Sequence, residues 1–98
     1  MAGIEFEWDD SNRGHIAEHR VTWREAEEVI LNNPVDLERQ NRSGEERLLQ
    51  VGETKAGRIL VIVSTFSGTM IRVITAWDAR AHLTRYWKTV RSIKERKR

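Results

Sequence analysis

The sequence contains no cysteine. This excludes a disulfide framework and a thiol nucleophile, and it leaves only histidine and carboxylate side chains as metal ligands. Long hydrophobic runs are missing too: the longest apolar stretch is Ile59 to Val63, whereas a helix needs about 20 apolar residues to span a bilayer. The opening residues Met1 to Glu5 lack the basic stretch of a secretion signal. We therefore expect a cytoplasmic protein with no membrane contact.

An excess of positive charge occurs in only one segment of the sequence. The chain has a net charge of +2, yet residues 80–98 contain eight Lys and Arg side chains and one glutamate, so they carry +7 and the first 79 residues carry −5. A basic block attracts phosphates, because each neutralised phosphate releases counterions; a solvated helix end is the structural alternative. The length of 98 residues predicts one domain, residues 1–98, with a basic C-terminal helix and tail from about residue 78.

The first third of the chain predicts one strand and two helices. Residues 4–8 alternate apolar and charged side chains, which is the period of a half-buried strand. Asp9 or Asp10 is placed to cap a helix that continues to about Glu18. Residues 22–25 then form a capping-box pattern, which predicts the start of a second helix.

The rest of the chain predicts four strands and a last helix. Turn residues separate apolar runs, as between adjacent antiparallel strands. The expected strands are residues 35–38, 47–53, 58–65 and 70–77. The third of these is apolar on both faces, which predicts a central position, and Asp78 is expected to cap the final helix. The fold class is therefore α+β, an antiparallel meander sheet flanked by two N-terminal helices and one C-terminal helix.

Tryptophan is abundant, with four in the chain. Trp8, Trp23 and Trp87 lie on apolar stripes, so we expect them in the core. Trp77 closes the last strand, where an exposed ring could stack on a nucleobase. Tyr86 and Trp87 alternate with basic residues, which is typical of a nucleic-acid surface, although one of the two rings must face inward. The candidate nucleic-acid-binding residues are Trp77, Arg80, Arg85, Lys88 and Arg91.

Standard catalytic motifs are missing: there is no Gly-rich phosphate loop, no G-x-S-x-G and no H-E-x-x-H. His15 and His19 are four residues apart and share one face of the first predicted helix. The spacing suits a metal ion, but no third ligand stands at a suitable separation, so we expect neither a metal nor a cofactor. The pair could instead transfer protons, because imidazole titrates near neutral pH, or simply pack against a neighbouring element.

Two arginines near the starts of predicted strands are candidate phosphate ligands, because a guanidinium binds a phosphate with two parallel hydrogen bonds. Arg47 follows two glutamates and could equally pair with a carboxylate. Arg72 is expected to share its strand face with Met70, Ile74 and Ala76, so its charge needs a partner or a bound anion. Structural and functional roles stay open for both.

A series of short motifs occurs in a recognisable order and spacing. They are Phe6-Glu7-Trp8-Asp9, Asn12, His15, Ile16, His19, Val21-Thr22, Glu25 to Val29, Arg47 to Leu49, Gly52 to Thr54, Gly57-Arg58 and Ile71 to Ala76. Together they resemble the BrnT-type toxins, the ribonuclease partners of bacterial toxin-antitoxin pairs, over roughly residues 5 to 90.

This resemblance implies a RelE-like fold and a type II toxin whose ribonuclease activity a cognate antitoxin neutralises. It also implies a metal-independent reaction in which the ribose 2′-hydroxyl attacks the adjacent phosphate, with a proton acceptor, a cation and a proton donor at hand. By resemblance, His19 or His15 is the base or acid, Arg47 and Arg72 hold the phosphate, and Tyr86 is a supporting donor. The implied partners are RNA, the antitoxin, and operator DNA through the antitoxin complex.

The chain departs from the family pattern at four positions. Trp77 stands where many relatives have Arg, Leu83 where many have Glu, Asn12 near a Lys of one branch, and Arg20 where Gly is usual. The basic residue lost at Trp77 leaves an alternative open: a degenerate, non-catalytic member that binds nucleic acid or protein. A metal-dependent or small-molecule enzyme is a third alternative.

Overall fold

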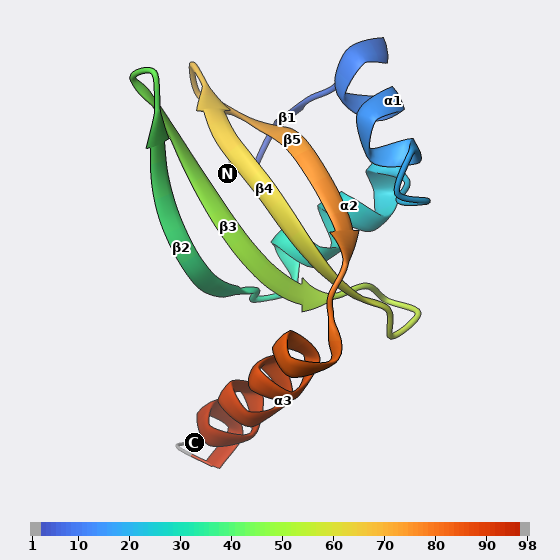
Figure 1. The fold of residues 1–98 in the computed structure, drawn as a ribbon, viewed down its shortest axis with the longest axis vertical. Coiled ribbons are helices and arrows are strands. Elements are labelled where there is room, and N and C mark those ends of the chain that lie inside the picture. Colours follow the sequence, from blue (N-terminus) through green and yellow to red (C-terminus); the bar gives the residue numbers. More distant parts are fainter. Residues whose placement is uncertain (1–2, 97–98) are drawn as a thin grey trace.

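The computed structural model describes residues 3–96, in which three helices flank one five-stranded sheet (Figure 1). The strands are β1 (Phe6–Glu7), β2 (Val35–Arg42), β3 (Glu45–Glu53), β4 (Ile59–Ser67) and β5 (Met70–Asp78). The helices are α1 (Asp10–Ala17), α2 (Trp23–Leu31) and α3 (Ala81–Arg96). This is the predicted α+β class. The end of the predicted basic tail, residues 97–98, lies outside the described residues.

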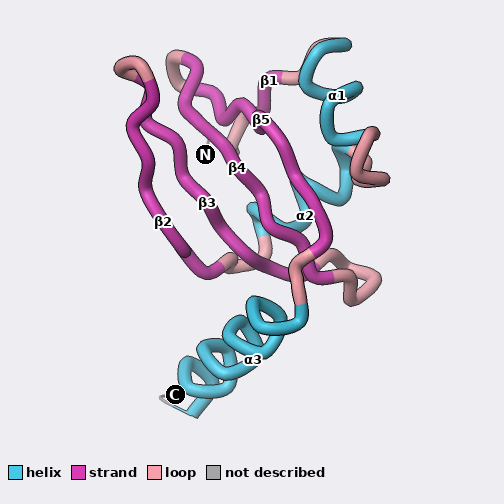
Figure 2. Tube along the Cα trace, viewed as in Figure 1, coloured by secondary structure: helices cyan, strands magenta, loops and turns pink. Residues whose placement is uncertain are grey.

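The sheet is mixed, with the strand order β1-β5-β4-β3-β2. Sequential strands from β2 to β5 pair antiparallel. Strand β1, however, runs parallel to β5, with Phe6 opposite Ile71, so the prediction of a wholly antiparallel sheet is wrong at the first strand. Parallel neighbours need a long crossover, and here both N-terminal helices and three strands separate β1 from β5 in the chain (Figure 2).

The two faces of the sheet carry separate apolar clusters. Helices α1 and α2 cover one face, where Leu60 and Ile62 pack with Ile16 of α1. On the opposite face, Val61 packs with Trp87 of α3. Helix α3 lies at the end of the sheet toward which β3 and β5 run, so it covers that end of the face and leaves the other end open (Figure 1). Strand β4 contributes side chains to both clusters and is the middle strand of the sheet, which confirms its predicted central position.

An additional residue in β5 changes which side chains share a face. The register with β4 shifts between Val63 and Ser64, and Ile74 is the inserted residue. Beyond this bulge Ala76 joins the cluster under α1 and α2, whereas Arg72 points to the open face. The prediction that Arg72 and Ala76 share a face is therefore wrong, because a one-residue shift moves every following side chain to the other side.

Both N-terminal helices begin with the predicted caps. Asp9 and Asn12 form a reciprocal capping box for α1, and Thr22 and Glu25 form one for α2. Asn12 is buried, and its amide nitrogen donates to the carbonyls of Glu7 and Val73, both at 3.0 Å. The cap of α1 thereby fixes that helix to both β1 and β5.

The turn between α1 and α2 contains Arg20 in the left-handed region, with φ 59°. Glycine adopts this conformation without a steric cost, whereas an L side chain does not. This is the position at which the resemblance led us to expect glycine, and Arg20 adopts here a backbone conformation that glycine would favour.

Two expectations about single residues are wrong. Asp78 is the last residue of β5 and does not cap α3, because its carboxylate binds Arg58 instead, at 2.8 Å. Trp23 is 39% exposed, because it is the first residue of α2, and the guanidinium of Arg24 lies over its ring. Trp87 is buried as predicted, and Trp8 packs half-buried against the core.

No helix within residues 3–96 is both long enough and apolar enough to cross a membrane.

Candidate functional site

A row of polar side chains crosses the open face of the sheet. Gln40 of β2 lies opposite Arg47 of β3, Thr65 of β4 opposite Arg72 of β5, and Arg72 opposite Glu7 of β1. The β3–β4 register, continued by one residue beyond Leu48 and Ser64, places Arg47 opposite Thr65. The sheet thus brings the two predicted arginines onto one row and one face, with Cα atoms about 10 Å apart across two strand spacings. We call these five residues the polar row.

Arg72 is held in the polar row by two carboxylates. Its Nη1 donates to Glu7 at 3.1 Å and to Asp9 at 3.0 Å, and its Nη2 donates to Asp9 at 3.3 Å. The hydrogen bond from Arg72 lowers the pKa of Asp9, and the same bond raises the pKa of Arg72. The prediction that Arg72 needs a partner is confirmed. Two of its five N–H groups, on Nε and Nη2, have no acceptor among residues 3–96.

Arg47 is less constrained. Its Nε donates to Glu45 at 2.9 Å, so the predicted pairing with a neighbouring carboxylate does form. Its four Nη hydrogens have no acceptor in the described part of the chain. The side chains of Arg47 and Arg72 are 29% and 24% exposed. Both guanidinium groups therefore keep donors that could reach a phosphate above the sheet.

The two predicted histidines lie on α1 and in the turn that follows it, beside the end of β5. Both are exposed, with ring centroids 6.4 Å apart, and His19 meets Trp77 edge to face at 6.5 Å. Trp77 is five residues beyond Arg72 on the same strand, a distance of about 16 Å at the usual rise. The structure therefore brings His19 together with His15 and with Trp77, and it places Trp77 at the opposite end of β5 from Arg72. Within residues 3–96, no three His, Cys, Asp or Glu side chains gather into a group that could hold a metal.

The remaining predicted residues lie on or just before α3. Arg80, Arg85 and Lys88 are exposed, and the Tyr86 ring is 49% exposed beside the buried Trp87. Arg91 differs, because it donates to Glu53 and Glu95 and its guanidinium lies 5.1 Å from the Trp87 ring centroid. Of the two adjacent aromatic rings, Trp87 is therefore the one that faces inward.

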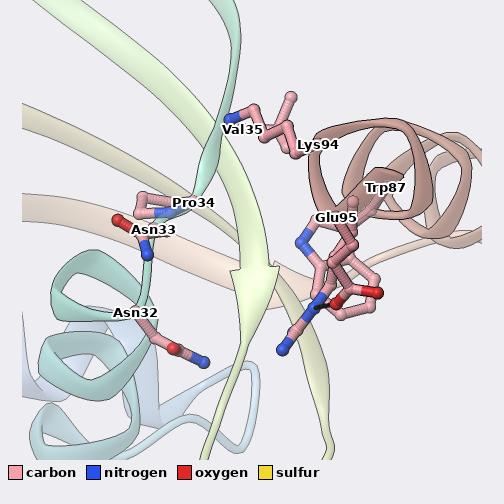
Figure 3. A pocket seen from close by; sticks show the side chains of 8 residues that line it. Asn32, Asn33, Pro34, Val35, Trp87, Lys94 and Glu95 are labelled. Atoms are coloured by element: carbon pink, nitrogen blue, oxygen red, sulfur yellow. Dashed lines mark hydrogen bonds and ion pairs between the residues drawn. The ribbon is translucent and has the colours of Figure 1, made fainter. Parts of the chain in front are cut away.

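Helix α3 and the segment between α2 and β2 enclose a groove of about 350 Å³. Asn32, Asn33 and Pro34 line one side of it, and Trp87 and Lys94 line the other (Figure 3). Arg91 is the one predicted nucleic-acid-binding residue of this lining, and none of the predicted catalytic residues contributes to it.

Arg58, for which the sequence pattern predicts no catalytic or binding role, binds three separate segments. Its guanidinium makes two hydrogen bonds to Asp78, at 2.8 and 3.1 Å. Its Nη1 also lies 3.1 Å from Glu25 and donates to the carbonyl of Arg20 at 2.7 Å. The signal in the sequence was an arginine directly before the most apolar strand, a position at which its charge needs carboxylate partners.

These hydrogen bonds shift the pKa values of Arg58 and of the two carboxylates that it binds. The bond to Asp78 raises the pKa of Arg58, and the bond from Arg58 lowers the pKa of Asp78. Burial alone would raise the pKa of Glu25, but the Thr22 backbone and Arg58 both donate to its carboxylate, and the net pKa is lowered. All three groups are therefore charged at neutral pH.

Acid is expected to destabilise the fold through these carboxylates. The pKa values of Asp9, Glu25 and Asp78 are lowered in the folded chain. Their contribution to stability is present above the unfolded values, near pH 4, and is lost as the pH falls through the folded ones. We expect Tm, followed by circular dichroism, to fall below about pH 4, and to fall less steeply in Asp78→Asn. Equal slopes for the variant and the wild type would contradict this.

Comparison with known proteins was made with curated proteins and with family models. No curated protein matches the chain. A family model does match, over residues 8–82, and its description is the ribonuclease toxin BrnT of type II toxin-antitoxin systems. The matched range includes every residue of the polar row except Glu7, both predicted histidines, Trp77 and Arg58, and it confirms the resemblance seen in the sequence. The chain therefore belongs to the BrnT family of ribonuclease toxins.

Proposed function

We propose that this chain is a RelE-like, metal-independent endoribonuclease of the cytoplasm, which a cognate antitoxin keeps inactive. The observation that carries the proposal is the polar row: Arg47 and Arg72 stand on one uncovered sheet face with N–H donors to spare. Because the chain belongs to a family of ribonuclease toxins from toxin-antitoxin systems, we infer that its substrate is RNA and its partner an antitoxin. The antitoxin covers the open face and carries the complex to operator DNA.

The arginines supply the electrostatic part of RNA binding. Fixed guanidinium groups hold backbone phosphates with charge-assisted hydrogen bonds, and they thereby position the RNA for attack of a ribose 2′-hydroxyl on its adjacent phosphate, with departure of the 5′-oxygen of the next nucleotide, beside the imidazoles. Glu7 and Asp9 hold Arg72 from one side, so its remaining donors keep a fixed direction. Thr65, between the two arginines, adds a small polar side chain to the surface that the RNA backbone crosses.

The RNA continues along β5 to the His19–Trp77 pair. A span of about 16 Å separates this pair from Arg72 at the usual strand rise, so the arginines hold the backbone a few nucleotides away from the imidazoles. Trp77 offers a half-buried ring on which a base stacks, and His19 or His15 transfers protons. The exposed basic residues Arg80, Arg85 and Lys88 extend the positive surface, and Tyr86 is the supporting donor.

Expression in bacteria tests the proposal. We expect induction to arrest growth with loss of intact RNA, and co-expression of the adjacent reading frame to restore growth. The purified protein should cleave RNA in the presence of EDTA. Arg47→Gln should reduce cleavage about 100-fold, as expected when a contact that positions the substrate is lost. Arg39→Gln is the matched control, because Arg39 is an exposed arginine of the neighbouring strand that lies opposite Leu48 on the other face.

A second candidate is a non-catalytic member that only binds nucleic acid. Trp77 replaces a basic residue of many relatives, and carboxylates already engage both arginines, which favours this alternative. Normal growth and intact RNA at confirmed soluble expression would select it. Charge reversal at Arg85 and Lys88 would then weaken RNA binding more than any change at His19 does.

A further inference from the structure

Arg58 fixes the positions of two segments that carry predicted functional side chains. Its guanidinium binds the carboxylate of Asp78, the residue after Trp77, and the carbonyl of Arg20, the residue after His19. The Arg58 guanidinium therefore binds the residue that follows His19 and the residue that follows Trp77. The ring centroids of His19 and Trp77 lie 6.5 Å apart. This guanidinium thereby links the turn that follows α1 to the end of β5, directly beside the His19 and Trp77 rings.

The backbone of Arg58 is itself rigid. Its amide donates to Thr54 Oγ1 at 3.0 Å, and its carbonyl accepts from the Thr54 amide at 2.9 Å. Thr54 is 2% exposed. The guanidinium thus extends from a fixed point directly before the central strand β4, so it can impose a position on the segments that it binds.

The turn that follows His19 needs such a support. Arg20 has φ 59°, a conformation that costs energy for any residue with a side chain. The hydrogen bond from Arg58 to the Arg20 carbonyl, at 2.7 Å, is among the shortest in the protein and holds that conformation. Glu25, in the first turn of α2, keeps the same Nη1 of Arg58 in place from the other side of the turn.

We propose that Arg58 is a positioning residue that holds the His19 imidazole against the Trp77 indole, where the proposed RNA cleavage uses it. The inference rests on the proposed function for the role of His19, but the geometry of the pair is measured independently of activity. Lysine cannot replace arginine here, because a single ammonium cannot bind Asp78 with two parallel hydrogen bonds while it also contacts Glu25 and the Arg20 carbonyl.

The test compares Arg58→Lys with Arg24→Lys. Arg24 is an exposed arginine next to Glu25 that contacts Trp23 and lies outside the proposed site, so it controls for the loss of a guanidinium. The first measurement is the nuclear Overhauser effect between the His19 and Trp77 ring protons, recorded below the Tm of each variant. We expect Arg58→Lys to lose this signal and Arg24→Lys to retain it.

The second measurement is the rate of RNA cleavage. We expect kcat of Arg58→Lys to fall about ten- to a hundred-fold, because a misplaced catalytic group lowers the rate of the chemical step. KM should change less than about twofold, because the substitution leaves the polar row untouched. A residue with a structural role alone would lower Tm and leave the ring contact and kcat unchanged, and that result overturns the proposal. Should Arg58→Lys not fold, Asp78→Asn removes the charge of one partner only and must weaken the same ring contact.

The two proposals fail in different ways. If the ring contact survives in folded Arg58→Lys or Asp78→Asn, the positioning role is overturned whatever the activity of the protein. If the contact is lost in Arg58→Lys while His19→Ala cleaves RNA at the wild-type rate, the positioning of the pair is upheld and the catalytic assignment of His19 is overturned.

Discussion

Replacing His19 with alanine is expected to reduce kcat for RNA cleavage about a thousand-fold, within the range that a general acid or base contributes. The reason is the position of His19: it is exposed, and its ring is held edge to face against Trp77 at 6.5 Å. His15, whose ring lies 6.4 Å from that of His19, has no such contact with Trp77. We therefore expect a smaller loss for His15→Ala. Single-turnover cleavage of a defined RNA measures both.

The matched control is His82→Ala. His82 is the third histidine of the chain, exposed on α3 and outside the proposed site. It should leave kcat within about twofold of the wild type, as a surface substitution away from the chemistry does. Equal losses for all three variants would point to an effect on folding, and unchanged rates for His19→Ala would remove His19 from the mechanism.

Replacing Trp87 with alanine is expected to reduce the free energy of unfolding by about 3 kcal/mol, within the range for a buried tryptophan. Trp87 is 5% exposed and is the α3 side chain at the centre of the cluster formed with Val35, Val51 and Val61. Helix α3 touches only one end of the sheet, so this ring supplies much of its attachment (Figure 1). Urea denaturation followed by circular dichroism measures the change.

Tyr86→Ala is the control for that measurement. Tyr86 is the adjacent aromatic residue, but its ring is 49% exposed, so its loss should change the free energy of unfolding by no more than about 0.5 kcal/mol. Similar destabilisation by both substitutions would mean that α3 does not dock through Trp87. The docking of α3 on the sheet also holds its basic side chains in position, so Trp87→Ala should weaken RNA binding as well.

Local patterns predicted the elements well because local interactions form them. The caps were predictable, Thr22 directly and Asp9 as one of two adjacent aspartates, because their side chains bind backbone groups three residues away. The central position of β4 followed from its apolar residues on both faces. Strand ends were less accurate: β2 continues to Arg42 although its last residues are polar, because they pair with β3 at the edge of the sheet.

The candidate site was predictable by residue type but not by arrangement. The sequence identified Arg47 and Arg72 as candidate phosphate ligands, and it left open whether carboxylates engage them; the structure shows that carboxylates do, while donors remain. The grouping of His19 with Trp77, and its distance from the arginines, depends on how α1 lies along β5. That packing joins residues more than 50 positions apart, which no local pattern reports.

The sequence by itself determined what short-range chemistry controls: the α+β class, the helix caps, the central strand, the basic α3 and the membership of the BrnT family. The tertiary structure decided the rest. It set β1 parallel to β5, reversed the face of Ala76 through a single inserted residue, and gathered Asp78, Glu25 and the Arg20 carbonyl around Arg58. Each of these depends on contacts between distant segments, whose register and orientation are fixed only when the whole sheet closes its core.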